Sequence, residues 1–380
     1  MQYVKYCPKC GTPNDQHALF CRKCGYPLNN KKCPSCGKDI PFTYQRCPYC
    51  GYVFPTVTPS KARYTITKSY PFIQQKVAPT GNIIRDITLI YKMAFNKRTP
   101  IYAPSDKVYQ YLPYDTLVRS SKYLQYALLT FLIGVLLAFT VTITEKRIMF
   151  FLPSFFAAIL PILFYIYWMK KVDRYEPEPF WILALAFGWG AASTLIAILL
   201  NDILIPFLGG WAGAAAFVEE PSKILGIYLL AINPRLGKEL NDHLDGLLYG
   251  ALAGLGFGFI ENILYISRGL AIGNWLIIAL RAITVGMHMF CTGLIGWWIG
   301  YLKVTNKQIN IYNILPALLF AIFIHMTWNT VTYLGLLGLL IILVLGPFLI
   351  LKAHKMAIEA LIDEYYWGFT RGYAPIEKYR

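Results

Sequence analysis

The chain changes from a polar N-terminal part to a long series of apolar stretches. From position 123 onward, apolar runs of about 20 residues, each long enough to cross roughly 30 Å of hydrocarbon as a helix, follow one another. Eight such runs are predicted, at roughly 123–143, 149–168, 180–200, 211–232, 246–266, 274–301, 313–332 and 334–351. The last two are joined by a very short loop, so seven spans are an alternative.

The first 54 residues carry a repeat built on cysteine. Eight of the nine cysteines form Cys-x-x-Cys pairs, and the second two pairs repeat the first two at an offset of 26 residues. A glycine follows each pair, which lets the backbone turn back toward a metal. The pattern predicts two Cys₄ ribbons, each closed around one structural Zn²⁺. The ligands are Cys7, Cys10, Cys21 and Cys24 in the first ribbon, and Cys33, Cys36, Cys47 and Cys50 in the second.

The predicted fold is therefore an all-α polytopic membrane protein with two small N-terminal zinc ribbons. Between ribbons and membrane, the segment 55–122 reads as a basic linker, in which 83–95 is expected to form a helix at the membrane surface. The expected organisation is 1–54 double zinc ribbon, 55–122 linker, 123–351 multi-spanning membrane domain and 352–380 cytoplasmic tail.

Composition and charge favour the same picture. The chain is 56% hydrophobic and 15% charged, whereas soluble domains carry about 25% charged residues. Residues 1–122 hold 19 of the 36 Lys and Arg and only 5 of the 20 Asp and Glu. A basic segment beside a membrane domain is typical of the cytoplasmic side, and we favour contact with anionic lipids over nucleic-acid binding. Both termini are expected in the cytoplasm of a bacterium or archaeon.

Ionisable side chains inside four consecutive predicted helices are the most informative feature. Such residues cost about 2.5–3.5 kcal/mol each on insertion scales, so they usually serve a function. They are Glu219, Glu220, Lys223, Glu261, Arg281, His288 and His325, with Asn329 as a polar companion. Residues four apart share a helix face, as Glu219 and Lys223 do, so each helix is expected to present one polar patch to a common cavity.

These motifs resemble those of the PrsW family of intramembrane proteases, which is related to the CAAX prenyl endopeptidases. The resemblance rests on Glu219-Glu220-x-x-Lys223, Phe257-x-x-x-Glu261, His288 and His325-x-x-x-Asn329. It covers about residues 150–350 and implies a membrane-embedded peptidase acting on membrane-associated proteins. One departure is that family members often carry Asp where this chain has Asn329.

Peptide hydrolysis needs an activated water and a group that stabilises the oxyanion. Glu219 is the expected base, with Glu220 supported by Lys223. His325 and Asn329 are expected to bind the oxyanion, and His288 and Glu261 to orient the water. A catalytic metal held by Glu219, His288 and His325 is an alternative, because Glu, His and His suit Zn²⁺.

Other interpretations stay open at this point. Buried Glu and His also suit a proton-coupled transporter, although no repeated halves are visible. The chain could instead be an inactive scaffold whose ribbons recruit a cytoplasmic protein, or a hydrolase or transferase of lipid-linked substrates. Glu220 and Lys223 also fit a purely structural pair, Arg281 fits a boundary or structural charge, and Phe257 and Cys291 fit packing.

Overall fold

The structure is a computed structural model. It describes residues 4–7, 13–15, 28, 30–41, 47, 49–52, 78–96, 121–173, 178–305 and 307–370. The chain divides into two compact units, one formed mainly by Met1–Gln74 and the other by Gln75–Asp173 and Pro177–Asp363. Each unit is described by itself.

The N-terminal unit contains two short antiparallel hairpins. In the first, β1 (Val4–Tyr6) pairs with β2 (Pro13–Asp15); in the second, β3 (Asn30–Lys32) pairs with β4 (Asp39–Pro41). In each repeat the first Cys-x-x-Cys pair lies in the sequence between the two strands of a hairpin, and the second pair follows the hairpin. Of the first ribbon's ligands only Cys7, which is buried, is described; Cys10, Cys21 and Cys24 lie outside the described residues.

The second ribbon brings its four cysteines together as the spacing predicts. Cys33, Cys36, Cys47 and Cys50 each offer a sulfur within 4.8 Å of the other three. Gly37 and Gly51 both have positive φ, 69° and 72°, the left-handed conformation that glycine adopts at no steric cost. The Gly37 and Gly51 amides donate to the carbonyl oxygens of Cys33 and Cys47, at 2.8 and 3.0 Å. This geometry suits one tetrahedral structural zinc.

The second unit is helical in all its described parts. Its helices are α1 (Ile83–Phe95), α3 (Ser121–Thr144), α4 (Phe151–Val172), α5 (Phe180–Phe207), α6 (Ala216–Ile232), α7 (His243–Ala271), α8 (Leu276–Val304), α9 (Ile311–Val331) and α10 (Gly335–Thr370). Short 3₁₀ turns η1 (Ile148–Phe150), η2 (Ala212–Ala215), η3 (Leu236–Lys238) and η4 (Thr332–Leu334) lie between them. The helices from α3 onward match the apolar runs one for one, and α1 coincides with the helix expected in the linker.

Six stretches of the described chain are long and apolar enough to cross a membrane. Five correspond to α3, α4, α5, α7 and α8, and the sixth runs through both α9 and α10. Helix α6 has 17 residues, which gives a rise of about 26 Å, and is therefore shorter than each of these six stretches. The number of separate crossings thus depends on α6 and on the break at η4, while the multi-pass architecture does not.

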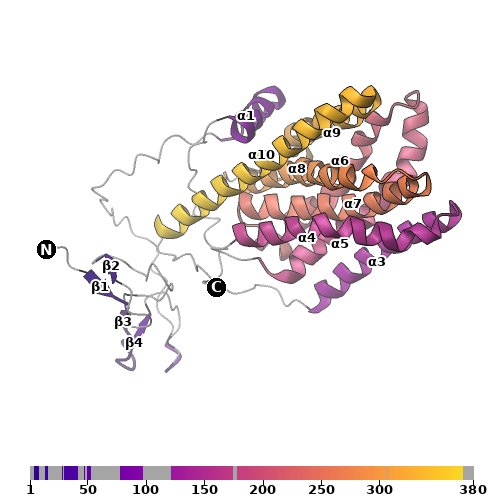
Figure 1. The fold of residues 1–380 in the computed structure, drawn as a ribbon. Helices are drawn as coiled ribbons and strands as arrows, with labels where there is room; N and C mark the ends of the chain where they lie inside the picture. The colour runs from indigo at the N-terminus through magenta and orange to yellow at the C-terminus, as the bar shows by residue number, and fades with distance from the viewer. Residues whose placement is uncertain are drawn as a thin grey trace. The chain divides into compact units, whose positions relative to one another are not determined.

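Helices α7 and α8 form the centre of this unit. They run alongside each other over most of their length, and nearly all of α7 is buried (Figure 1). Small residues make this approach possible: a Cβ added at Gly246 would strike the carbonyl oxygen of Gly296, and one at Gly254 would strike that of His288. Close packing through small residues is the usual way in which membrane helices associate. Here it fixes His288 against α7.

Helix α1 packs on the same bundle from outside, against α9. Its Phe95 ring stacks on Phe348 of α10 and meets Phe290 of α8 and Phe320 of α9 edge-on. Lys352 in α10 donates to the Phe95 carbonyl oxygen at 3.0 Å. The last turn of α1 is therefore held by three of the helices that carry or flank the polar residues.

Candidate active site

Helix α6 supplies three charged side chains from its first two turns. Glu219, Glu220 and Lys223 are all buried, and the last two are fully so. Lys223 Nζ lies 2.7 Å from Glu220 Oε1 and 3.8 Å from Glu219 Oε2, so the expected pairing of Glu220 with Lys223 is the closer of the two contacts. The same Nζ lies 4.4 Å from the centre of the Phe257 ring. One lysine is therefore the shared counter-ion of two adjacent carboxylates.

Glu220 is held by hydrogen bonds from three other side chains. Besides Lys223, it accepts from His325 Nδ1 in α9 at 2.7 Å and from Thr292 Oγ1 in α8 at 2.9 Å. Because Nδ1 of His325 donates its hydrogen to this carboxylate, Nε2 is the ring nitrogen that remains available for another contact. That nitrogen lies 3.5 Å from Glu219 Oε2. Glu220 thus acts as an orienting partner for His325, of the kind that fixes the tautomer of metal-ligating histidines.

Glu219 is the carboxylate with an unused oxygen. Its Oε1 accepts from Asn201 Nδ2 in α5 at 3.3 Å. Its Oε2 is buried and makes no hydrogen bond with any described residue. A buried polar atom without a hydrogen bond is costly, so its presence beside two histidines calls for a ligand, a proton or a water.

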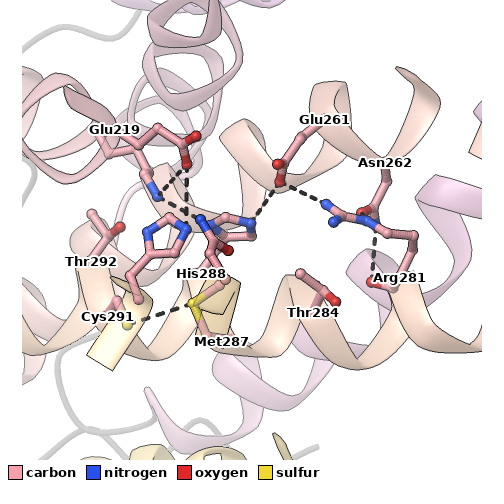
Figure 2. A network of polar contacts seen from close by, with 12 residues as sticks. Glu219, Glu261, Asn262, Arg281, Thr284, Met287, His288, Cys291 and Thr292 are labelled. Atoms are coloured by element: carbon pink, nitrogen blue, oxygen red, sulfur yellow. Dashed lines mark hydrogen bonds and ion pairs between the residues drawn. The ribbon is translucent and has the colours of Figure 1, made fainter. Parts of the chain in front are cut away.

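His288 connects this group to α7. Lys223 Nζ lies 3.1 Å from His288 Nδ1, and since a lysine only donates, that nitrogen accepts. His288 Nε2 lies 2.7 Å from Glu261 Oε2, although the two are not aligned as a hydrogen bond. The rings of His288 and His325 meet edge-on with centres 5.0 Å apart. Figure 2 shows Glu219 and Glu261 on opposite sides of His288.

The structure places Asn329 apart from the other candidates. It lies one turn after His325, and its amide donates to the Ala212 carbonyl oxygen in η2 at 3.4 Å. The described contacts join Glu219, Glu220, Lys223, Glu261, His288 and His325 into one cluster. Asn201, Thr292 and Arg281 contact this cluster, and Asn262 adjoins it through Arg281. Of these four the sequence singled out only Arg281, as a boundary or structural charge. A lone amide or hydroxyl in an apolar helix gave no sign of its partner.

A metal fits this donor set with one adjustment. Glu219, His288 and His325 each offer a ligand atom within 4.8 Å of the others, and all three are buried. The cluster holds three carboxylates against the two cations Lys223 and Arg281, so with neutral imidazoles it has one negative charge in excess. A divalent ion suits that balance and the Glu, His and His donors. His288 would have to exchange its contact with Lys223 or Glu261 to join.

Comparisons with known proteins match the part of the chain that carries these residues. Residues 178–352 match the model of the PrsW family intramembrane metalloproteases, and residues 7–51 match that of the double zinc ribbon. A Protease PrsW of Clostridioides difficile (strain 630) is 30% identical over 227 residues, covering 56% of this chain and 92% of that protein. A Protease PrsW of Bacillus subtilis (strain 168) is 25% identical over 179 residues, covering 43% of this chain and 77% of that protein. No solved structure matches the chain.

These matches cover the helices that carry the charged cluster, and they decide between the alternatives that the sequence left open. The family is one of proteases, which excludes the transporter and the inactive scaffold as the general class. The resemblance drawn from the motifs, the zinc-ribbon fold and the peptidase activity are thereby confirmed. The chain belongs to the PrsW family of intramembrane metalloproteases and carries a double zinc ribbon at its N terminus.

Proposed function

We propose that the cluster of α6, α7, α8 and α9 hydrolyses peptide bonds of membrane-embedded proteins with a water activated by Glu219. The observation that carries the proposal is the buried Glu219 Oε2, which lacks a hydrogen bond to any described residue and lies 3.5 Å from His325 Nε2. A water beside this oxygen loses a proton to Glu219 as it attacks the peptide carbonyl carbon. Glu219 then returns that proton to the leaving amine.

The neighbouring residues take supporting roles. Glu220, bound to Lys223 and Thr292, holds His325 in the orientation that directs Nε2 at Glu219. With a second proton on Nε2, His325 donates from that nitrogen to the oxyanion, and Asn329 joins it, since the 3.4 Å bond of its amide to Ala212 is long and easily exchanged. His288 and Glu261 orient the water from the opposite side.

The family name implies a metal, and Glu219, His288 and His325 are the residues that would hold it. When bound, a divalent ion lowers the pKa of a coordinated water and polarises the peptide carbonyl. The roles of Glu220 and Lys223 are the same with or without it, because both act on His325 and on the charge of the cluster.

The orientation of the cluster in the membrane follows from the Lys and Arg of the loops. With the N terminus inside, α6 and α8 begin and α7 and α9 end on the outer side. His325 then lies about 9 Å and Glu261 about 15 Å from the outer helix ends, at about 1.5 Å per residue. We therefore propose that residues 123–351 form the catalytic domain and cut in the outer half of the bilayer. The zinc ribbons and the tail face the cytoplasm, where the ribbons recruit a protein partner.

The test is a cleavage assay in detergent with a panel of single-span membrane proteins labelled at both ends. Glu219→Gln is expected to abolish cleavage, because the amide cannot accept the water's proton. Asp202→Asn is a matched control, since Asp202 is an exposed carboxylate on the neighbouring helix α5. Equal cleavage by wild type and Glu219→Gln would refute the role of Glu219. Chelator treatment, with zinc counted by mass spectrometry, separates a catalytic ion from the ribbon zinc.

A further inference from the structure

A second buried network adjoins the cluster at Glu261. Arg281 lies in α8, two turns before His288, and its side chain is largely buried. Its Nη2 donates to Glu261 Oε2 at 2.6 Å, and its Nε donates to Asn262 Oδ1 at 2.6 Å (Figure 2). One guanidinium thus binds two consecutive residues of α7.

Both ends of this network are fixed. The Asn262 amide donates back to the Arg281 carbonyl oxygen at 3.2 Å, which closes a ring between α7 and α8. The guanidinium also lies 4.6 Å from the centre of the Tyr265 ring. A planar guanidinium held by an amide and an aromatic face has little freedom, so its remaining donors have a set direction. That direction is toward Glu261.

The oxygen that Arg281 binds is the one that faces the active site. Glu261 Oε2 accepts from Arg281 at 2.6 Å and lies 2.7 Å from His288 Nε2. The position of this oxygen, and so the rotation of the His288 ring, therefore depends on the guanidinium. Without the arginine, Glu261 would keep only the imidazole contact among these, and its carboxylate could turn away.

The free-energy cost of burying this arginine argues against a role limited to packing α7 on α8. Arg268, near the same end of the bundle, pairs with Glu145 at 2.7 Å but has half of its side chain exposed. Such a surface pair contributes little and can remain in water. Arg281 instead sits within a predicted span, where a charge is expensive and usually functional. An apolar side chain would pack α7 on α8 without that cost.

We propose that Arg281, clamped by Asn262, is a positioning residue that sets Glu261 and through it His288 for catalysis. The inference rests on the proposed function, because Glu261 and His288 matter only if the cluster is the active site. Arg281 does not touch the substrate. Its loss is therefore expected to lower kcat by about 10- to 100-fold, as is found for other partners that orient metal-site ligands. KM should stay nearly unchanged.

The test measures kcat and KM of the full-length protein on the best-cleaved single-span protein of the panel. The variants are Arg281→Met, Arg281→Lys, Glu261→Gln and the double variant Arg281→Met/Glu261→Gln, with Arg268→Met as the matched control. Arg281→Lys retains a cation for Glu261, so it should recover part of the kcat lost in Arg281→Met. The double variant should be no slower than Glu261→Gln alone, since Arg281 acts through that carboxylate. Arg268→Met should keep wild-type kinetics.

Thermal unfolding of each variant separates positioning from folding. Three results would each overturn the inference. The kcat loss of the double variant could equal the product of the two single losses, Arg281→Lys could lose as much kcat as Arg281→Met, or Arg281→Met could keep the wild-type kcat. If Glu261→Gln has no measurable activity, the comparison of Arg281→Lys with Arg281→Met decides alone. Glu219→Gln is assayed alongside, and the proposed function fails if this variant stays active. If Glu219→Gln is inactive while Arg281→Met is fully active, only the positioning role of Arg281 is refuted.

Discussion

Replacing Lys223 by methionine tests the charge balance of the cluster. Methionine fills a similar volume but removes the cation that lies 2.7 Å from Glu220 and 3.8 Å from Glu219. Glu220 keeps its bonds from His325 and Thr292, yet two adjacent buried carboxylates then face each other without a counter-ion. We expect Lys223→Met to be strongly destabilising.

The size of the effect follows from the burial of the pair. Removing one partner of a buried ion pair costs about 3–5 kcal/mol, because the other charge is left uncompensated. For a unit of this size about 1 kcal/mol shifts Tm by 2–4 °C, so the loss should be roughly 6–20 °C. Lys171→Met is the matched control, because Lys171 is exposed at the end of α4. It should change the unfolding free energy by no more than about 0.5 kcal/mol.

A second substitution should reverse most of that loss. In the double variant Lys223→Met/Glu220→Gln the two closest opposite charges are removed together, so that Glu219 is the one carboxylate left of the adjacent pair. The glutamine oxygen can accept from His325 in place of Oε1, while its NH₂ group can donate to the Thr292 hydroxyl in place of Oε2. Tryptophan fluorescence during heating in detergent, at one fixed heating rate, gives Tm for the two single variants and the double. The double variant should lose less than half of what Lys223→Met loses. A Tm loss equal to the sum of the two single losses would refute the coupling between Lys223 and Glu220.

Three further predictions concern packing, zinc and topology. Gly254→Val should lower kcat by about 10²-fold, because its side chain would displace the His288 backbone, and a misplacement of about 1 Å is enough for that loss; normal kinetics would contradict the packing argument. Cys33→Ser should lower the zinc content measured by mass spectrometry by one ion per chain, and an unchanged content would contradict the Cys₄ site. Alkaline phosphatase inserted in the loop at Gly273 should be active, whereas a fusion after Arg380 should not; the reverse pattern would contradict the proposed orientation.

The sequence predicted the helices well because their length and composition follow from the bilayer. Runs of about 20 apolar residues can only be helices in lipid, where every backbone group must be bonded internally. The second zinc ribbon was predictable for a similar reason, since the spacing of four cysteines determines the ligand set. Neither prediction needed any knowledge of how helices contact one another.

The partners across helices were not predictable in the same way. Within α6 both expected neighbours of Lys223 are in contact with it, Glu220 at 2.7 Å and Glu219 at 3.8 Å. Helical spacing gives the face of a side chain but not the rotation of the neighbouring helix. Thr292, which bonds to Glu220, and Asn201, which bonds to Glu219, therefore emerged only from the structure. Each is a single polar group in an apolar helix, a pattern that many packed helices share.

The same limit applies to Arg281. Its position two turns before His288 suggested a boundary or structural charge but named no partner. The structure buries it against Glu261 and Asn262, because α7 and α8 approach closely enough through glycines for an arginine of one helix to bridge two residues of the other. Distances between helices carry this information, and one sequence does not contain them in readable form.

The most direct test of the account is to identify the bond that is cut and the source of the oxygen added. Wild-type protein is incubated with a single-span substrate in H₂¹⁸O, and the products are sequenced by mass spectrometry. The account predicts cleavage in the outer half of the span, with ¹⁸O in the new carboxylate, and no such product from Glu219→Gln. The same product from Glu219→Gln, or cuts confined to segments outside the membrane, would contradict it.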